Sequence, residues 1–387
     1  MDFALSDTER DIRDTARDFI RKEVMPLEQQ ALRRERNHQP ALERDELRDL
    51  QASAKAFGFW GLSTPHEYGG MALPAVLQSL IATEVGRSVV PFTFGGEADN
   101  ILFRANDSQQ QEYLLPTIAG DRISCFAITE PGAGSDVANI GLTARRDGDD
   151  WNLNGEKTFI TKGNDADFAI VIAFTGEKGV RNGGATAFLV DRAMGWKSEF
   201  IPTMGEGGPA ALVFDDVRVP GSNVLGEIGQ GFDLAMQWIG KGRYLIPSLA
   251  IGIAERALAM AIEQANTRVT FGRKIGENQA IAWMIADSEV ELEAARSLVL
   301  RAAWTVDQGQ DARHASSMAK LYGAGMVNRV VDRVMQIHGG MGYTKELPVE
   351  HWYRQVRLFR IFEGTDEIQR LIISRDLLKG YTKLGGA

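Results

Sequence analysis

One carboxylate near the end of the chain is well placed to do chemistry. Glu363 follows an apolar run over residues 358–362, and Gly364 and Thr365 come directly after it. Glycine frees the backbone and threonine is a good N-cap, so we expect a helix to begin here. A carboxylate with apolar neighbours suits a base whose pKa is tuned. It could equally do no more than complement the helix dipole, and this stretch alone leaves both roles open.

A second candidate is the loop TEPGAGSD, residues 129–136, which follows an apolar run. Its glycines let the backbone approach a ligand closely, and the hydroxyls of Thr129 and Ser135 can form hydrogen bonds. A tight loop with capping residues has the same composition, so a purely structural role stays open. Val137 stands where a dinucleotide fingerprint needs a third small residue, which argues against that fingerprint.

Three further stretches place hydroxyl, cationic or aromatic residues beside glycine. Residues 159–161 end a predicted strand, residues 268–272 close a long predicted helix, and residues 336–342 end another helix with a glycine cluster. Each is weak alone, because a basic residue at a helix C-terminus is common. The five histidines have no metal-ligand spacing, so no metal site is predicted.

The bulk composition is that of an ordinary globular protein. The 387 residues are 44% apolar and 25% charged, which allows two or three domains. The net charge of −9 argues against a nucleic-acid partner. The one cysteine, Cys125, lies in an apolar run and is expected to be an inert buried thiol. We see no signal peptide and no uncharged run of about 18 residues, so we expect a cytoplasmic protein without a membrane span.

The chain divides into three parts of different character. Residues 1–121 are predicted to be all-helical, with a capping box at Ser6 and an end to the first helix at Pro26. Further helices are expected at residues 41–58, 75–85 and 108–120.

The middle part, residues 122–226, is predicted to be a small antiparallel β-barrel or sandwich. Asp147-Gly148 and Asn154-Gly155 are predicted hairpin turns. Strands are expected at residues 142–146, 151–153, 168–174, 186–191 and 211–219.

The last part, residues 227–387, is predicted to be a four-helix bundle, so that the fold class is α+β and multidomain. Its helices are expected at residues 232–267, with Pro247 inside, at 281–309, at 311–337, and from Thr365 onward. Apolar residues recur at steps of three and four along them.

Five motifs in this order resemble the acyl-CoA dehydrogenases, a family of FAD flavoproteins. The resemblance covers essentially the whole chain. Its signatures are CFAITEPGAGSD (125–136), FITKG (159–163), TRVTFGRKI (267–275), QIHGGMGY (336–343) and FEGTDEIQR (362–370).

The resemblance implies that FAD lies between the β-domain and the bundle. The family usually has Trp where Phe159 stands, and often Gln where Glu367 stands. The implied cofactor residues on the flavin side are Phe126, Ile128, Thr129, Gly134, Ser135, Phe159, Thr161, Thr365 and Glu367. Those implied to hold the FAD of a neighbouring subunit are Arg268, Thr270, Phe271, Gln279, Gln336, Gly339 and Gly340.

The implied reaction is α,β-dehydrogenation of an acyl-CoA thioester to the trans-2-enoyl-CoA. Glu363 would remove the α-proton, its own backbone N–H would polarise the carbonyl, and the β-hydride would pass to flavin N5. Some members carry the base just before an arginine of the first bundle helix, where this chain has Gly242. That departure strengthens the assignment of Glu363.

The resemblance also implies partners. Positions that contact acyl-CoA are matched by Ser135, Arg243, Gly364 and Arg375, although Gly240 replaces a common acidic or amide residue. A homotetramer or dimer is implied by the shared FAD site, and an electron-transfer flavoprotein is implied as the electron acceptor. The alternative is an oxygen-reactive relative, an oxidase or monooxygenase of the same fold. The acyl chain itself is not predicted.

Overall fold

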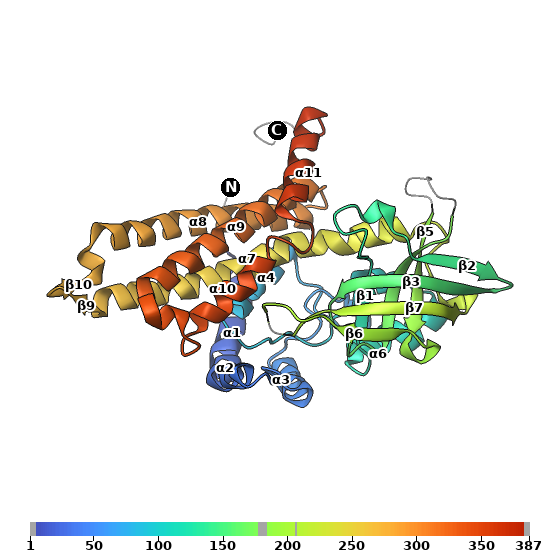
Figure 1. Ribbon diagram of the computed structural model, residues 1–387, viewed down its shortest axis with the longest axis horizontal. Coiled ribbons are helices and arrows are strands. Elements are labelled where there is room, and N and C mark those ends of the chain that lie inside the picture. The colour runs from blue at the N-terminus through green and yellow to red at the C-terminus, as the bar shows by residue number, and fades with distance from the viewer. Residues whose placement is uncertain (1–4, 177–183, 206, 383–387) are drawn as a thin grey trace.

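A computed structural model of the protein describes residues 5–176, 184–205 and 207–382. Helices, a β-sheet and a helical bundle follow one another along the chain, which confirms the predicted three-part architecture (Figure 1). The residue boundaries proposed at 121/122 and 226/227 stay predictions. The first four residues, which entered the expectation about a signal peptide, lie outside the described residues.

The first helix begins where its capping box predicts. The Ser6 hydroxyl accepts a hydrogen bond from the Glu9 backbone, and the Glu9 carboxylate accepts one from the Ser6 N–H. The predicted end at Pro26 is wrong, because this proline lies in the first turn of a 3₁₀ segment, where it needs no N–H partner. The helical segments are α1 (Asp7–Phe19), a π-turn (Ile20–Val24), a 3₁₀ turn (Met25–Leu27), α2 (Glu28–Arg36), α3 (Arg44–Ala56), α4 (Ala75–Gly86), α5 (Asp107–Gln109), a π-turn (Gln110–Leu114) and α6 (Leu115–Ala119).

The middle part is one eight-stranded sheet in the order β6-β7-β3-β2-β4-β5-β8, with β1 paired to β4. Most neighbours are antiparallel, but β1 and β2 both pair with β4 in parallel, so the prediction of a purely antiparallel sheet is wrong. The β2–β3 hairpin intervenes between β1 and β4, which lets the chain return in the same direction. The strands are β1 (Ser124–Ala127), β2 (Thr143–Asp147), β3 (Asp150–Ile160), β4 (Phe168–Phe174), β5 (Ala185–Asp191), β6 (Lys197–Phe200), β7 (Ala210–Val219) and β8 (Val224–Leu225).

One of the two predicted hairpin turns is also wrong. Asp147 ends β2 and pairs with Asp150 across a tight turn, as predicted. Asn154-Gly155, however, lies inside β3, where the register against β7 shifts between Leu153 and Gly155. Gly155 has a φ of 139° there, which only glycine adopts readily, so the dipeptide marks a β-bulge rather than a turn.

The bundle contains a helix that the sequence analysis did not predict, α10, which packs against α9. The last helix, α11, contacts the first half of α9 and projects away from the other helices (Figure 1). Thr365 caps α11 as expected. The elements are α7 (Gly231–Thr267), the hairpin β9 (Val269–Thr270) and β10 (Arg273–Lys274), α8 (Gln279–Asp307), α9 (Arg313–His338), α10 (Pro348–Leu358) and α11 (Asp366–Leu378).

By length and composition alone, α7 could cross a membrane, contrary to the expectation from uncharged runs. In its most apolar stretch, however, 61% is buried inside the protein. The helix supplies Ala250, Ala254, Ala257 and Ala261 to the same core as α8 and α9. The apolar character of α7 is therefore that of a central bundle helix.

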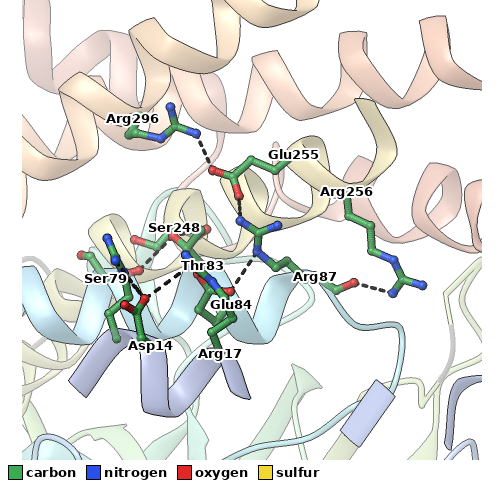
Figure 2. A network of polar contacts seen from close by, with 11 residues as sticks. Asp14, Arg17, Ser79, Thr83, Glu84, Arg87, Ser248, Glu255, Arg256 and Arg296 are labelled. Carbon is green, nitrogen blue, oxygen red and sulfur yellow. Dashed lines mark hydrogen bonds and ion pairs between the residues drawn. The ribbon is translucent and has the colours of Figure 1, made fainter. Parts of the chain in front are cut away.

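A network of charges joins the N-terminal helices to the bundle (Figure 2). The buried Glu84 on α4 forms ion pairs with Arg17 of α1 at 2.8 Å and with Arg87 at 3.0 Å. Arg87 also pairs with Glu255 on α7, which in turn pairs with Arg296 on α8. Four helices, α1, α4, α7 and α8, are thus joined through this network.

Two glycines let α4 and α7 cross closely. A Cβ at Gly252 would lie 1.9 Å from the carbonyl oxygen of Thr83, and one at Gly86 would lie 2.2 Å from that of Leu249. Real Cβ atoms do not approach backbone so closely, so any larger residue forces the helices apart.

We therefore expect Gly252→Ala to destabilise the protein by about 1–3 kcal/mol, despite the higher helix propensity of alanine. The measurement is the thermal unfolding midpoint, which should fall by several degrees. Gly325→Ala is the matched control, because its Cβ would meet only the mobile end of Arg329 at 3.1 Å. An unchanged midpoint for Gly252→Ala would show that the helices can separate at little cost.

Candidate functional site

Glu363 lies in a turn between α10 and α11 with two of its own polar groups unpaired. Its φ is 54°, in the left-handed region that costs a non-glycine residue energy. Within the described residues, its carboxylate oxygen Oε2 is buried without a hydrogen-bond partner. Its backbone N–H likewise has no acceptor in that part of the chain. A strained residue with an unpaired acceptor and donor is arranged to meet a ligand.

The surroundings of this carboxylate disfavour its charge. Burial raises the pKa of Glu363 to about 7, while the positive charges of Arg243 and Lys320 oppose that rise. Arg243 is itself half-buried, its Nε has no partner among the described residues, and burial lowers the pKa of its guanidinium. A carboxylate with a pKa near 7 can exchange a proton at physiological pH, as a general base must.

Gly242 on α7 makes room for this carboxylate. A Cβ at that position would lie 3.0 Å from both Cδ and Oε2 of Glu363. Glycine in a helix costs about 1 kcal/mol of stability relative to alanine, so the presence of glycine at position 242 is not explained by helix stability. The position that the sequence analysis discussed as an alternative base is therefore in direct contact with the Glu363 side chain.

Two residues that sequence reasoning missed hold the turn in place. The fully buried Gln369 of α11 donates through Nε2 to the carbonyl oxygens of Glu363, at 3.1 Å, and Gly364, at 3.0 Å. Lys320 of α9 donates to the same Gly364 oxygen at 2.7 Å. The sequence signal was a lysine on the buried face of a helix whose other buried residues are small or apolar.

The glycine-rich loop is anchored by a buried ion pair. Glu130 accepts hydrogen bonds from the backbone of Gly141 and Leu142 and from Nζ of Lys157 at 2.8 Å. Lys157 also donates to the Ile128 oxygen, and its burial lowers the pKa of this ammonium to about 8. Although this ion pair anchors the loop, Gly134 and Ser135 at its tip are exposed. A Cβ at Gly134 would meet nothing within 4 Å. The fold itself therefore does not require that glycine.

The side chains of Phe126 and Ile128 are buried in the core, so any contact that these residues make with a ligand would be through their backbone. The Phe126 ring stacks on Trp238 of α7, with ring centroids 4.2 Å apart. Trp238 donates to Asp99 at 2.6 Å, and it lies one helical turn before Gly242. This contact joins the β-domain and the loop around residue 99 to the helix that borders Glu363.

Two further predicted flavin-side residues, Phe159 and Thr161, lie at the surface of the β-domain. Phe159 is 61% exposed and has a φ of 57°, which is costly for an aromatic residue. The backbone of neighbouring Thr158 donates to the oxygen of Thr129 at 2.8 Å, so strand β3 and the glycine-rich loop are adjacent. Thr161 is exposed nearby. An exposed aromatic ring beside a hydroxyl-bearing loop can accept a planar heterocycle.

The second predicted cofactor group lies far from the first. The β9–β10 hairpin projects from the end of the bundle opposite to the sheet (Figure 1). Phe271 at its tip is fully exposed, with a φ of 52°. The start of α8 and the end of α9 lie at this same end, because α8 follows the hairpin and α9 runs back antiparallel to it. The residues gathered there are Arg268, Thr270, Phe271, Gln279, Gln336, Gly339 and Gly340. One chain therefore does not bring the two groups together.

The predicted substrate residues are only partly gathered. Arg243, Glu363 and Gly364 lie together where α7 meets the turn before α11. Arg375 lies further along α11, 3.6 Å from the buried Asp376. Ser135 belongs to the loop of the β-domain. Glu367 is 77% exposed on the first turn of α11, where its carboxylate lies 3.7 Å from Arg370.

Comparison with known proteins identifies the family. Models described as the N-terminal, middle and C-terminal domains of acyl-CoA dehydrogenase match residues 6–121, 125–217 and 229–378. The chain belongs to the acyl-CoA dehydrogenase family. The members of this family are FAD-dependent oxidoreductases, which confirms the resemblance and the expected cofactor.

Individual family members match over nearly their full length. The bovine mitochondrial short-chain specific acyl-CoA dehydrogenase is 36% identical over 97% of this chain and 92% of its own. The CarC subunit of the caffeyl-CoA reductase-Etf complex of Acetobacterium woodii is 40% identical over 84% of this chain and 88% of its own. The structure of butyryl-CoA dehydrogenase from Megasphaera elsdenii superposes with a TM-score of 0.87, at 32% identity, over 98% of this chain and all of the other.

The residues of this acyl-CoA dehydrogenase fit FAD. Phe159 and Phe271 both have exposed aromatic rings and strained backbone conformations. Their rings are not packed into the core, so they are available to a planar ligand. Gly132, Gly134 and Gly340 each leave open space where a Cβ would stand. Arg268 supplies a guanidinium, which suits a pyrophosphate.

Proposed function

We propose that this protein catalyses α,β-dehydrogenation of an acyl-CoA thioester to the trans-2-enoyl-CoA, with Glu363 as the base. The observation that carries the proposal is that Oε2 of Glu363 and the backbone N–H of the same residue both lack a hydrogen-bond partner among the described residues. An α-proton next to a thioester is removed only when a base meets it while a donor polarises the carbonyl. One residue supplies both groups here.

The surrounding residues support this role in distinct ways. Gly242 leaves space for the carboxylate, and Arg243 favours its ionised form. When bound, FAD supplies the acceptor for the β-hydride. Phe159 at the end of β3 and Thr161 just after it would border the flavin, and Thr129, Gly134 and Ser135 would border it from the loop. Phe126 and Ile128 contribute backbone groups, and Thr365 and Glu367 belong to the same predicted set.

We propose that the substrate is held by Ser135, Arg243, Gly364 and Arg375. Gly240 has no side chain for the adenine end of coenzyme A, and a Cβ there would meet nothing within 4 Å. This suggests looser recognition of that end. The loop around Asp99 and the Phe126–Trp238 stack are candidates for limits on the acyl chain.

We propose a homo-oligomer, a tetramer or dimer, in which each FAD is shared between subunits. The support is the separation of the two cofactor groups within one chain and the exposure of Phe271, Val269 and Trp283 at the far end of the bundle. A second copy would bring its Arg268 group against the FAD held by the first.

We propose an electron-transfer flavoprotein as the electron acceptor. The CarC relative, a subunit of a reductase-Etf complex, supports this choice. It also favours a second candidate, an enzyme that works in the reducing direction on an enoyl-CoA. The relatives named as dehydrogenases do not support the alternative of an oxygen-reactive enzyme.

The test is an anaerobic screen in which the absorbance of the purified flavoprotein is followed during addition of straight, branched, cyclic and aryl acyl-CoAs. A dehydrogenase bleaches with at least one saturated acyl-CoA. The flavin of a reductase is not bleached by saturated acyl-CoAs. When this flavin is first reduced with dithionite, an enoyl-CoA reoxidises it. Rapid reoxidation of the substrate-reduced enzyme by air would overturn the dehydrogenase in favour of an oxidase.

The raised pKa of Glu363 predicts a pH profile. Because the base must be ionised, kcat/KM should rise about tenfold per pH unit below about pH 7 and level off above it. The measurement is the initial rate across pH with an artificial electron acceptor. A profile that is flat from about pH 5 to 8 would contradict a base with this pKa.

A further inference from the structure

Lys320 is a fully buried cation without an ionic partner. It lies on α9, and its side chain has no exposed surface. No carboxylate within the described ranges of the chain forms an ion pair with it, and its hydrogen bond goes to the carbonyl oxygen of Gly364 at 2.7 Å. Lysine is rarely buried in this way unless it is paired, because removing an ammonium from water is costly. Such a residue calls for an explanation beyond packing.

The carbonyl that it binds belongs to the turn that carries the base. Glu363 and Gly364 have φ values of 54° and 85°, two successive residues in the left-handed region. Within the described residues, no backbone N–H donates to their carbonyl oxygens, and the side chains of Gln369 and Lys320 do so instead. A strained turn persists only when surrounding contacts hold it in that conformation. The hydrogen bonds from Gln369 and Lys320 are such contacts.

Glycine is required at 364 for the same reason. A Cβ there would lie 2.7 Å from Nε2 of Gln369 and would displace the amide that holds the turn. The turn, Gln369 and Lys320 therefore form one fitted unit from which the Glu363 side chain extends toward α7.

Lys320 also contributes charge to the site below about pH 8, the value to which burial lowers the pKa of its ammonium. The charged groups that face Glu363 are Arg243 from α7 and Lys320 from α9, with Arg313 close to Arg243. From α11, Asp366 and Glu367 act on Lys320, and Asp366 is paired with Arg360 at 2.7 Å. Two cations thus act on the carboxylate from two different helices, and both favour its ionised form.

We propose that Lys320 is a positioning residue for the base: its ammonium fixes the Gly364 carbonyl, and with it the Glu363 turn, while its charge favours the ionised carboxylate. This inference rests on the proposed role of Glu363. It assigns Lys320 no contact with the substrate or the cofactor.

The test compares Lys320→Met, Lys320→Gln and Lys320→Arg as FAD-loaded enzymes. Two quantities are measured across pH: kcat, and the protonation of Glu363 from its infrared carboxyl band, identified by its loss in Glu363→Gln. Lys320→Met should move the titration of Glu363 upward by about one pH unit. It should also lower kcat roughly 10- to 100-fold on the alkaline plateau, because the turn loosens.

The other two variants separate charge from geometry. Lys320→Gln keeps a donor but no charge, so it should show the titration shift with a smaller loss of kcat. Lys320→Arg keeps the charge and should titrate like the wild type. Lys197→Met, on an exposed strand of the β-domain, is the control for loss of a lysine and should change neither quantity.

Each outcome decides. An unchanged Glu363 titration and plateau kcat in Lys320→Met would overturn the proposal, as would a loss of thermal stability alone. If Lys320→Met does not accumulate as holoenzyme, Lys320→Gln carries the test. If neither accumulates while Lys320→Arg does, the lysine serves folding and the proposal fails. The infrared titration reads Glu363 whether or not it is the base, so failure of the proposed function is recognised separately, by an active Glu363→Gln.

Discussion

Glu363→Gln should lower kcat by about 10²- to 10⁴-fold, the range that a positioned general base supplies. The amide keeps the shape of the side chain and leaves the backbone N–H in place, but it cannot accept the α-proton. Substrate binding should persist, so acyl-CoA should still perturb the flavin spectrum without bleaching it. The measurements are kcat with an artificial acceptor and the rate of anaerobic flavin reduction.

The same variant should be at least as stable as the wild type at alkaline pH. Burial raises the folded-state pKa of Glu363 from 4.5 to about 7, so stability is full below the unfolded value and is lost as pH rises through about 7. A neutral glutamine avoids this loss, which is at most about 3 kcal/mol. Glu112→Gln, an exposed carboxylate of the N-terminal part, is the control and should leave kcat unchanged. Retained activity in Glu363→Gln would show that another group removes the proton.

Gly242→Ala should lower kcat roughly 10- to 100-fold, because it adds a methyl group where the base now lies. The new Cβ would stand 3.0 Å from Oε2 of Glu363, closer than carbon and oxygen ordinarily approach, so the carboxylate must move. Helix α7 itself should gain about 1 kcal/mol, which separates lost activity from lost structure. The measurements are kcat and the thermal midpoint of the holoenzyme.

Gly240→Ala is the matched control on the same helix. Its Cβ would meet nothing within 4 Å, so it should give the same gain in helix stability and leave kcat near that of the wild type. If Gly242→Ala also kept full kcat, the carboxylate would not depend on the space that this glycine leaves.

Local chemistry was the part of the fold that could be predicted. The capping box at Ser6 and the buried run 168–174 depend on neighbouring residues, and both formed as expected. The parallel pairing of β1 with β4 could not be predicted, since it depends on the path of the hairpin between them. Asn154-Gly155 shows that one dipeptide is compatible with two structures. The conformational freedom of glycine allows either a turn or a bulge, and here the pairing of β3 with β7 makes it a bulge.

The missed helix α10 carried its own signal. Pro348 stands at its first turn, and Val349, Trp352 and Val356 follow at helical spacing and are all buried. In the site, Glu363 was predicted from its motif, whereas Lys320 and Gln369 act through bonds to backbone atoms. Such bonds depend on tertiary geometry, and only the unusual burial of a lysine pointed toward them. The roles assigned to the predicted cofactor and substrate residues stay predictions.

The close approach of Gly242 to Glu363 has a consequence for how such a site evolves. A carboxylate at 242 would collide with the one at 363 and repel it, so the pocket has room for one of them only. Moving the base from the turn before α11 to helix α7 needs two substitutions. The intermediate with both residues is crowded, and the intermediate with neither lacks a base. The two positions are therefore epistatic, and a lineage that carries its base at one of them is separated from the other arrangement by variants of low fitness.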